Sequence, residues 1–181
     1  MNTKYTLGLN FLHSDSSACI FKDNVLIAAS EEERFTRVKH TSVFPKQSII
    51  YCLKEANINI SNVDIVTINS NPFSDLSKKI IFVLKNLTSI KIAISSFLNS
   101  KKKISLKKKL SEIDFENKFN GNIEFVDHHK SHIGSSLFFS KFSECANLSI
   151  DGFGDFASCA YGLYKKNKLT IDEKVNFPHS M

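Results

Sequence analysis

The sequence predicts an α/β fold in which one unit, a strand followed by a polar turn and a hairpin, occurs twice. Residues 7–10, Leu-Gly-Leu-Asn, resemble residues 148–151, Leu-Ser-Ile-Asp, at an offset of 141 (148 minus 7). The same offset sets residues 17–19, Ser-Ala-Cys, against residues 158–160, Ser-Cys-Ala. Because both pairs keep their order and register, we interpret them as a duplicated unit.

The first copy and the residues after it alternate apolar runs with polar turns, which is typical of strands. A turn at residues 22–24 joins two of these runs, and Pro45 suits the first turn of a helix. The elements expected here are strands at residues 5–10, 17–21, 25–30 and 63–68, and a helix from Pro45 to about residue 57. Residues 31–40 are densely charged, so we expect either an exposed connection or an anion-binding loop.

The second half begins with a change of composition. Residues 76–119 contain no Gly or Pro and are rich in Lys, Ile, Leu and Ser, which favours two or more amphipathic helices. A strand at 122–126 and a helix from about 130 to 142 should follow. We therefore expect a first lobe over residues 1–145, including a Lys-rich helical segment at 74–119, and the start of a truncated second lobe at 146–181.

This duplication is the plan of the actin and sugar-kinase fold, in which two ribonuclease H-like lobes face a nucleotide cleft. The expected fold class is therefore α/β and actin/sugar-kinase-like, with an essentially complete first lobe. Polar turns of the two copies would meet across the cleft. Asn10, His13 and Asp15 would then face the turn at residues 151–155.

Composition indicates a folded domain rather than a disordered chain, with 42% hydrophobic and 23% charged residues. No apolar run approaches the roughly 20 residues that span a bilayer, and nothing resembles a signal peptide. The four cysteines lack a C-x-x-C spacing, so we expect reduced thiols in a cytoplasmic protein.

The net charge of +6 is concentrated in one lysine-rich run. Its members are Lys101, Lys102, Lys103, Lys107, Lys108 and Lys109. The run could bind nucleic acid or an anionic membrane, but it lacks interleaved aromatic residues and any recognised nucleic-acid motif. A solvated helix face without a nucleic-acid partner is therefore the expected structure.

A candidate metal site follows from three residues. His128 and His132 are four apart, so a helix would set both imidazoles on one face. Asp151 ends the short apolar run at 148–150, which should be a strand. Two imidazoles and a carboxylate suit one metal ion with open positions for substrate oxygens. The ordinary alternative is a chance histidine pair beside a hairpin turn.

Glycines and basic side chains mark candidate cofactor contacts. Gly152 and Gly154 would let backbone N–H groups approach a phosphate, and Arg34 offers donors to an anion. The full cofactor-binding set that we expect is Asn10, Asp15, Arg34, Gly152, Gly154 and Asp155.

Five motifs of the chain, in order, resemble the N-terminal signatures of the NodU and CmcH carbamoyltransferases. They are Asn10 to Cys19, Glu31 to His40, Val126 to His132, Ile150 to Gly154, and Phe177 to Ser180. The resemblance covers nearly the whole chain except residues 74–119.

The resemblance implies an O-carbamoyltransferase. Such an enzyme moves a carbamoyl group from carbamoyl phosphate, through an ATP-derived carbamoyl adenylate, to a hydroxyl of a natural-product or oligosaccharide acceptor. By that analogy His128, His132 and Asp151 bind a divalent metal ion, and Fe²⁺ is the ion expected. The residues matching His13, Lys39 and His40 would line the transfer pocket.

The family chain continues beyond the last motif into the rest of the second lobe and a YrdC-like domain. We therefore expect this chain to be inactive alone, with exposed apolar faces that a separate chain carrying the missing parts could cover. Two alternatives stay open: a noncatalytic remnant that binds nucleotide or a partner, and a protein of the tRNA threonylcarbamoyl transfer type. The latter proteins lack the charged run at residues 31–40.

Overall fold

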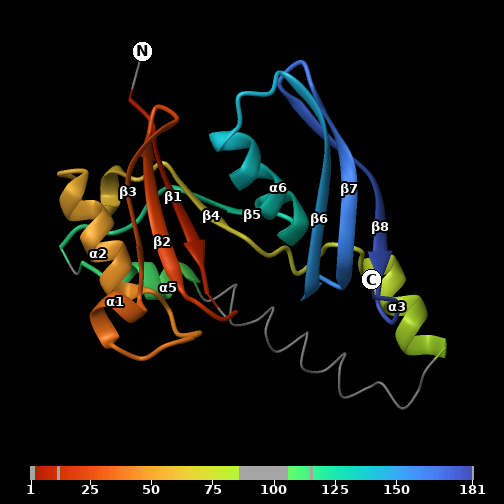
Figure 1. Cartoon of the computed structure of the whole chain (residues 1–181). Coiled ribbons are helices and arrows are strands. Elements are labelled where there is room, and N and C mark those ends of the chain that lie inside the picture. The colour runs from red at the N-terminus through yellow and green to blue at the C-terminus, as the bar shows by residue number, and fades with distance from the viewer. Residues whose placement is uncertain (1–2, 12, 86–105, 115, 181) are drawn as a thin grey trace. The chain divides into compact units, whose positions relative to one another are not determined.

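The computed structural model describes residues 3–11, 13–85, 106–114 and 116–180 (Figure 1). They form two compact units of a mixed α/β fold. Unit 1 comprises residues 1–69 and 94–125, and unit 2 comprises residues 70–93 and 126–181. This division differs from the expected boundary at residue 145, because the segment after residue 126 packs with the later strands.

Unit 1 contains a five-stranded sheet of order β3-β2-β1-β4-β5. Its strands are β1 (Tyr5–Asn10), β2 (Ser17–Lys22), β3 (Val25–Glu31), β4 (Ile65–Ile68) and β5 (Asn122–Phe125). β1, β2 and β3 are antiparallel neighbours, whereas β4 runs parallel to β1 and β5 runs parallel to β4. The strands expected from the sequence are thus confirmed, with β4 beginning two residues later than predicted.

Four helical segments of the described residues accompany this sheet, and all of them except α1 contribute buried residues to its core. They are α1 (Glu33–Thr36), α2 (Lys46–Glu55), the 3₁₀ turn η1 (Ile60–Asn62) and α5 (Leu106–Ser111). α2 packs on β2 and β3, with Ile49 and Cys52 fully buried (Figure 1). Leu7 and Leu9 of β1 belong to the same core, so the sheet and α2 are held together by apolar burial.

The charged run at residues 31–40 contains one buried member that the sequence did not single out. Glu32 is 2% exposed. Its carboxylate accepts hydrogen bonds from the backbone N–H groups of Gln47 (3.0 Å) and Ser48 (2.8 Å), and from the Ser48 hydroxyl (2.8 Å). These are donors at the start of α2, so Glu32 satisfies N–H groups that a helix leaves unpaired.

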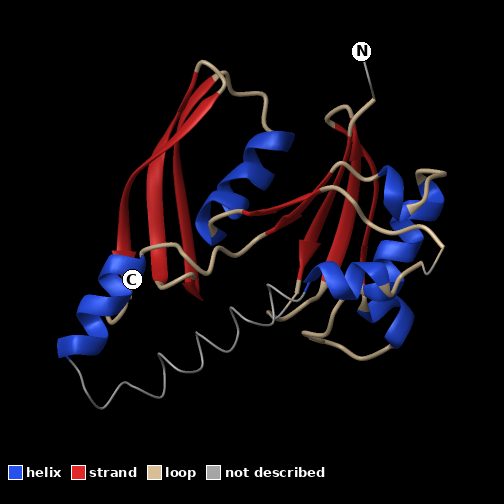
Figure 2. Ribbon diagram, turned by 180° about the vertical axis from the view of Figure 1, so that it is seen from behind, coloured by secondary structure: helices blue, strands red, loops and turns tan. Residues whose placement is uncertain are grey.

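Unit 2 contains a three-stranded antiparallel sheet of order β6-β7-β8. Its elements are α3 (Leu76–Lys85), α6 (His128–Phe139), β6 (Glu144–Gly154), β7 (Ala157–Lys165) and β8 (Lys168–Asn176). α6 packs on β6 and β7 (Figure 2). α3 is attached through Phe82, whose ring lies 5.8 Å from that of Phe156 and 5.0 Å from that of Phe177.

The pairing of the strands repeats at the offset that the sequence suggested. Each β1–β2 pair from Tyr5↔Lys22 to Leu9↔Ala18 recurs 141 residues later in β6–β7, from Ala146↔Leu163 to Ile150↔Cys159. The register shift against the third strand also recurs, between Ile20 and Phe21 in β2 and between Tyr161 and Gly162 in β7. The described strands thus carry the duplication in their backbone pairing.

The β2–β3 and β7–β8 hairpins also turn in the same way. Asp23 and Asn24 have φ values of 49° and 68°, and Lys166 and Asn167 have φ values of 51° and 59°. Two consecutive positive φ values are characteristic of the type I′ turn, whose twist matches that of the flanking strands.

The lysine-rich segment is described in part. In α5 the side chains of Leu106 and Leu110 are buried, whereas Lys107 and Lys108 are exposed. A solvated face is therefore confirmed for α5, while Lys101, Lys102 and Lys103 lie outside the described residues. Among the described residues, no helix has the length and apolar character needed to cross a bilayer.

All four cysteines are free thiols. Cys52 and Cys159 are buried, and Cys19 and Cys145 are half-buried. Burial, together with the nearby Cys19 and Glu55, raises the pKa of the Cys52 thiol to about 12. This thiol is therefore protonated and unreactive at neutral pH.

Candidate metal centre

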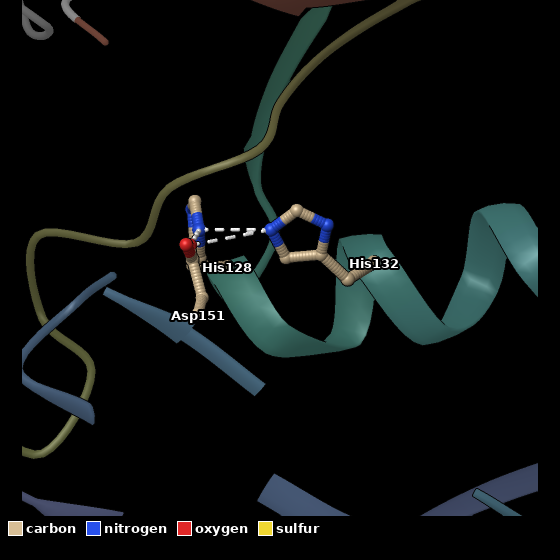
Figure 3. Close-up of side chains that lie close together, drawn as sticks. All are labelled: His128, His132 and Asp151. Carbon is tan, nitrogen blue, oxygen red and sulfur yellow. Dashed lines mark hydrogen bonds and ion pairs between the residues drawn. The ribbon is translucent and has the colours of Figure 1, made fainter. Parts of the chain in front are cut away.

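The start of α6 and the end of β6 bring three metal-ligating side chains together (Figure 3). His128 and His132 lie one turn apart on α6, and their Nε2 atoms are 3.0 Å apart. The Asp151 Oδ2 atom is 2.6 Å from His128 Nε2 and 3.5 Å from His132 Nε2. The sequence expectation that these residues converge is thus met, and within a single unit.

One side of this cluster is open. The His128 side chain is 8% exposed, whereas those of Asp151 and His132 are 38% and 53% exposed. The hydrogen bond from His128 lowers the pKa of the Asp151 carboxyl below its ordinary value, against the opposing effect of partial burial. A further hydrogen bond from the Gly152 N–H acts in the same direction, so Asp151 is kept as an anion.

The donor set fits a metal ion. The three ligand atoms lie within 4.8 Å of one another. Metal bonds of about 2.0–2.2 Å set neighbouring ligand atoms of one ion about 3–3.5 Å apart. The separations from His132 Nε2 to His128 and to Asp151, 3.0 and 3.5 Å, fall in this range, whereas the 2.6 Å between His128 and Asp151 is that of their hydrogen bond. Two imidazoles and one carboxylate with open positions suit Fe²⁺ in particular.

Gly154 makes room for His128. A Cβ atom at Gly154 would lie 1.9 Å from the His128 ring, whereas one at Gly152 would meet nothing within 4 Å. Since real contacts are never that short, any side chain at 154 must displace the imidazole. The structure thus shows that glycine is needed at position 154 to leave space for His128. The phosphate contact that the sequence led us to expect at Gly152 and Gly154 stays a prediction.

His129, which lies between the two candidate ligands in sequence, has a different role. It is 1% exposed, and its Nε2–H donates to the Ala157 carbonyl at 3.0 Å. Its Nδ1 then accepts a hydrogen bond from the Ser149 hydroxyl at 2.9 Å. Both ring nitrogens are thus used inside unit 2, where they tie α6 to β6 and β7.

Asp155 holds the first turn of α6. Its Oδ2 atom accepts hydrogen bonds from the backbone N–H groups of His128 (2.9 Å) and Asn71 (2.6 Å), and its Oδ1 atom accepts one from the Ser70 hydroxyl. Asp155 has a positive φ of 53°. These bonds give Asp155 a structural role, while the nucleotide contact expected from the sequence stays a prediction.

In unit 1, two of the expected residues meet. His40 Nδ1 lies 2.9 Å from Asp15 Oδ1, and because a carboxylate only accepts, the ring nitrogen donates. Asn10 donates to the carbonyls of Ser14 (3.2 Å) and Asp15 (2.9 Å) and accepts from Asn69 (3.1 Å). Asn10 therefore fixes the turn that presents Asp15 to His40.

The other expected residues of unit 1 are placed separately. Arg34 lies on α1 and pairs with Glu31 at 3.1 Å. Lys39 is exposed in the turn that follows α1, and His13 is half-buried in the bend after β1. Whether these side chains contact a ligand stays a prediction.

Comparison with known proteins identifies related sequences. A family model described as Carbamoyltransferase N-terminus matches residues 5–181. The uncharacterized protein sll1178 of Synechocystis sp. is 38% identical over 184 residues, covering 98% of this chain and 30% of that protein. The nodulation protein NolNO of Sinorhizobium fredii is 34% identical over 149 residues, covering 82% of this chain and 21% of that protein. The chain thus spans less than a third of the length of these relatives.

Among solved structures, YeaZ from Pseudomonas aeruginosa is similar to this chain. The two share 13% sequence identity with a TM-score of 0.46, over 98% of this chain and 72% of YeaZ.

Proposed function

Because the chain belongs to the carbamoyltransferase N-terminal family, we propose that it is the N-terminal part of an O-carbamoyltransferase. The reaction proposed is transfer of a carbamoyl group from carbamoyl phosphate, through carbamoyl adenylate, to a hydroxyl of a natural product or oligosaccharide. The observation that carries this proposal is the cluster of His128, His132 and Asp151 in a chain that matches the family from residue 5 to residue 181.

In this proposal the three clustered side chains hold a divalent metal, with Fe²⁺ favoured by the donor set. Such an ion supplies Lewis-acid stabilisation of negative charge on phosphate oxygens of the nucleotide. The protein contributes the rest: His129 and Asp155 fix α6, Gly154 admits the His128 ring, and Asp151 keeps its negative charge.

The pair of Asp15 and His40 supports an acid–base role. Since His40 Nδ1 donates to Asp15, the opposite ring nitrogen, Nε2, is available as an acceptor. A carboxylate that fixes the tautomer and orientation of an imidazole is the usual companion of a histidine base. We therefore propose His40 as the group that accepts the proton of the acceptor hydroxyl, with His13 and Lys39 lining the same pocket.

We further propose that the duplicated strands are the cores of two ribonuclease H-like lobes of an actin-like, ATP-binding fold in a cytoplasmic enzyme. The matching register of β1–β2 and β6–β7 supports that assignment. Since the chain spans 30% of sll1178 and 21% of NolNO, we expect transfer activity to need the parts that it does not cover, including a YrdC-like domain.

Metal binding by the purified chain is the first test. Anaerobic calorimetric titration with Fe²⁺ should show one site in the wild type, a strongly weakened site in His132→Ala, and an unchanged site in Asp172→Ala, an exposed control on β8. A wild type without a metal site would overturn the assignment of His128, His132 and Asp151.

Transfer is then measured with labelled carbamoyl phosphate, ATP and a panel of hydroxyl-bearing oligosaccharides and natural products. We expect the 181-residue chain to bind ATP and Fe²⁺ but to transfer no label alone. Transfer should appear in a longer chain that adds the remaining parts of the relatives. If that longer chain binds ATP and Fe²⁺ but still transfers nothing, a noncatalytic nucleotide-binding role replaces this proposal.

A further inference from the structure

Lys174, on the third strand of the unit 2 sheet, reaches the beginning of α6. Its Nζ atom lies 2.5 Å from Asp127 Oδ2, 3.0 Å from Asp75 Oδ2 and 3.2 Å from the Ser74 hydroxyl oxygen. The side chains of this group are shielded from water, with 16% of Lys174, 14% of Asp75 and 10% of Asp127 exposed. The Coulomb attraction between charges shielded in this way is larger than between charges on an open surface.

Asp127 connects this lysine to the candidate metal centre. It is the N-cap of α6, and its Oδ1 atom accepts the Lys130 N–H at 3.1 Å. Its Oδ2 atom is held by Lys174 and by the Ser74 hydroxyl, at 2.5 and 2.8 Å. His128 is the next residue, so the contacts that fix Asp127 also fix the backbone position from which the His128 side chain extends.

The geometry of the centre depends on how α6 sits on its sheet. His128 and His132 are on the helix, whereas Asp151 is on β6, and a small shift of the helix changes both nitrogen–oxygen separations. His129 ties α6 to β6 and β7. Lys174 supplies the corresponding tie to β8, so the first turn of α6 is held from every strand of the sheet.

We propose that Lys174 is a positioning residue for the metal centre, acting through Asp127 to fix the first turn of α6 against β8. This inference rests on the proposed function only in treating the three side chains as a metal site. Lys174 touches none of them directly; it acts through the helix cap. Because Asp75 and Ser74 precede α3, the same contacts link the start of α3 to the start of α6.

The test compares Lys174→Met with Lys165→Met in the 181-residue chain. Lys165 of β7 forms an exposed ion pair with Glu144 of β6 at 2.6 Å, at the end of the β6–β7 pairing opposite to Gly154, so its loss serves as the matched control. Two readouts are taken: Fe²⁺ affinity, and hydrogen exchange of the Lys130 and Ser131 amides without metal. We expect Lys174→Met to weaken Fe²⁺ binding about 10–100-fold, as for changes behind metal ligands, and to speed exchange of both amides.

A second variant guards against a Lys174→Met protein that does not fold. Ser74→Ala removes the hydroxyl that donates to Asp127 and accepts from Lys174, and it keeps all the charges. The same shifts should therefore appear at about 2–10-fold. Folded variants that lose thermal stability yet keep wild-type affinity and wild-type exchange would show a purely structural role and overturn the inference. If the wild type binds no Fe²⁺, the proposed function fails, whereas the exchange measurement still decides the role of Lys174.

Discussion

The meander β1–β3 of unit 1 and the meander β6–β8 of unit 2 share the register of their first two strands. They differ in what covers the first strand and in the residue that ends it. Leu7 and Leu9 of β1 are 0% and 3% exposed, whereas their counterparts Leu148 and Ile150 are 61% and 57% exposed. In unit 1 these positions join a core to which α2 contributes. Equivalent strand positions can therefore differ in burial, because the burial of a side chain depends on which helix packs against that face of the sheet.

The residue at the end of the first strand differs as well. Asn10 in unit 1 corresponds to Asp151 in unit 2 at the offset of 141. The Asn10 side-chain amide can donate, and it forms hydrogen bonds with backbone carbonyls of its own turn. The Asp151 carboxylate can only accept, and it meets the His128 imidazole instead. One equivalent position is thus structural in one copy and a candidate ligand in the other.

The largest effect is expected from a substitution that tests the difference in burial between the two first strands. Leu9→Ala should lower the free energy of unfolding by about 2–5 kcal/mol, because it empties a packed site in the core of unit 1. Ile150→Ala, at the corresponding position of unit 2, should change it by less than about 0.5 kcal/mol. Urea unfolding of both variants measures the difference, and equal losses would contradict it.

Next in size is the exchange of the strand-end residue. Asp151→Asn, which gives unit 2 the residue of unit 1, should weaken Fe²⁺ binding by more than the roughly 100-fold that changes behind a ligand reach. Asn10→Asp serves as the reciprocal variant, and it should create no site because unit 1 offers no described imidazole pair beside it. Anaerobic titration distinguishes the two; undiminished affinity in Asp151→Asn would remove it from the ligand set.

A smaller effect is expected from the glycine turn that follows. Gly154→Ala should displace the His128 ring and weaken Fe²⁺ binding about 10–100-fold. Gly152→Ala, whose new methyl group meets open space, should bind like the wild type. Similar affinities for both variants, measured by titration after each is shown to fold, would mean that the ring can move aside without loss.

The smallest effect concerns acid stability. Burial alone would raise the pKa of Asp75, but the hydrogen bond and charge of Lys174 outweigh it and lower that pKa below its ordinary value. A depressed pKa stabilises the fold above the unfolded value near 3.8, and this contribution is lost as pH falls below that value.

Asp75→Asn should therefore lose about 1 kcal/mol at neutral pH and show a flatter decline of stability below about pH 4. Asp172→Asn, an exposed change on β8, should follow the wild-type curve. Urea unfolding between pH 3 and pH 7 measures all three proteins. A wild-type slope retained in Asp75→Asn would assign the acid dependence to other carboxyls.

Much of this architecture was predictable because local patterns of apolar and polar residues indicate strands and helices. The apolar runs gave the strands of both meanders, and the spacing of His128 and His132 gave the candidate ligands on one helix face. Boundaries were less accurate: α6 begins at His128 and β6 extends to Gly154. Such ends are set by caps and cross-strand partners, which periodicity does not record.

The sequence by itself determined the duplication, the approximate positions of the strands and of the longer helices, and the three residue types suited to a metal. Only the tertiary structure decided that Glu32 is buried at the start of α2, that Gly154 is needed beside His128, and that Lys174 holds the cap of α6. The physical reason is distance along the chain. Side-chain patterns report the face of a single element, whereas these contacts join residues that only folding brings within a few ångströms.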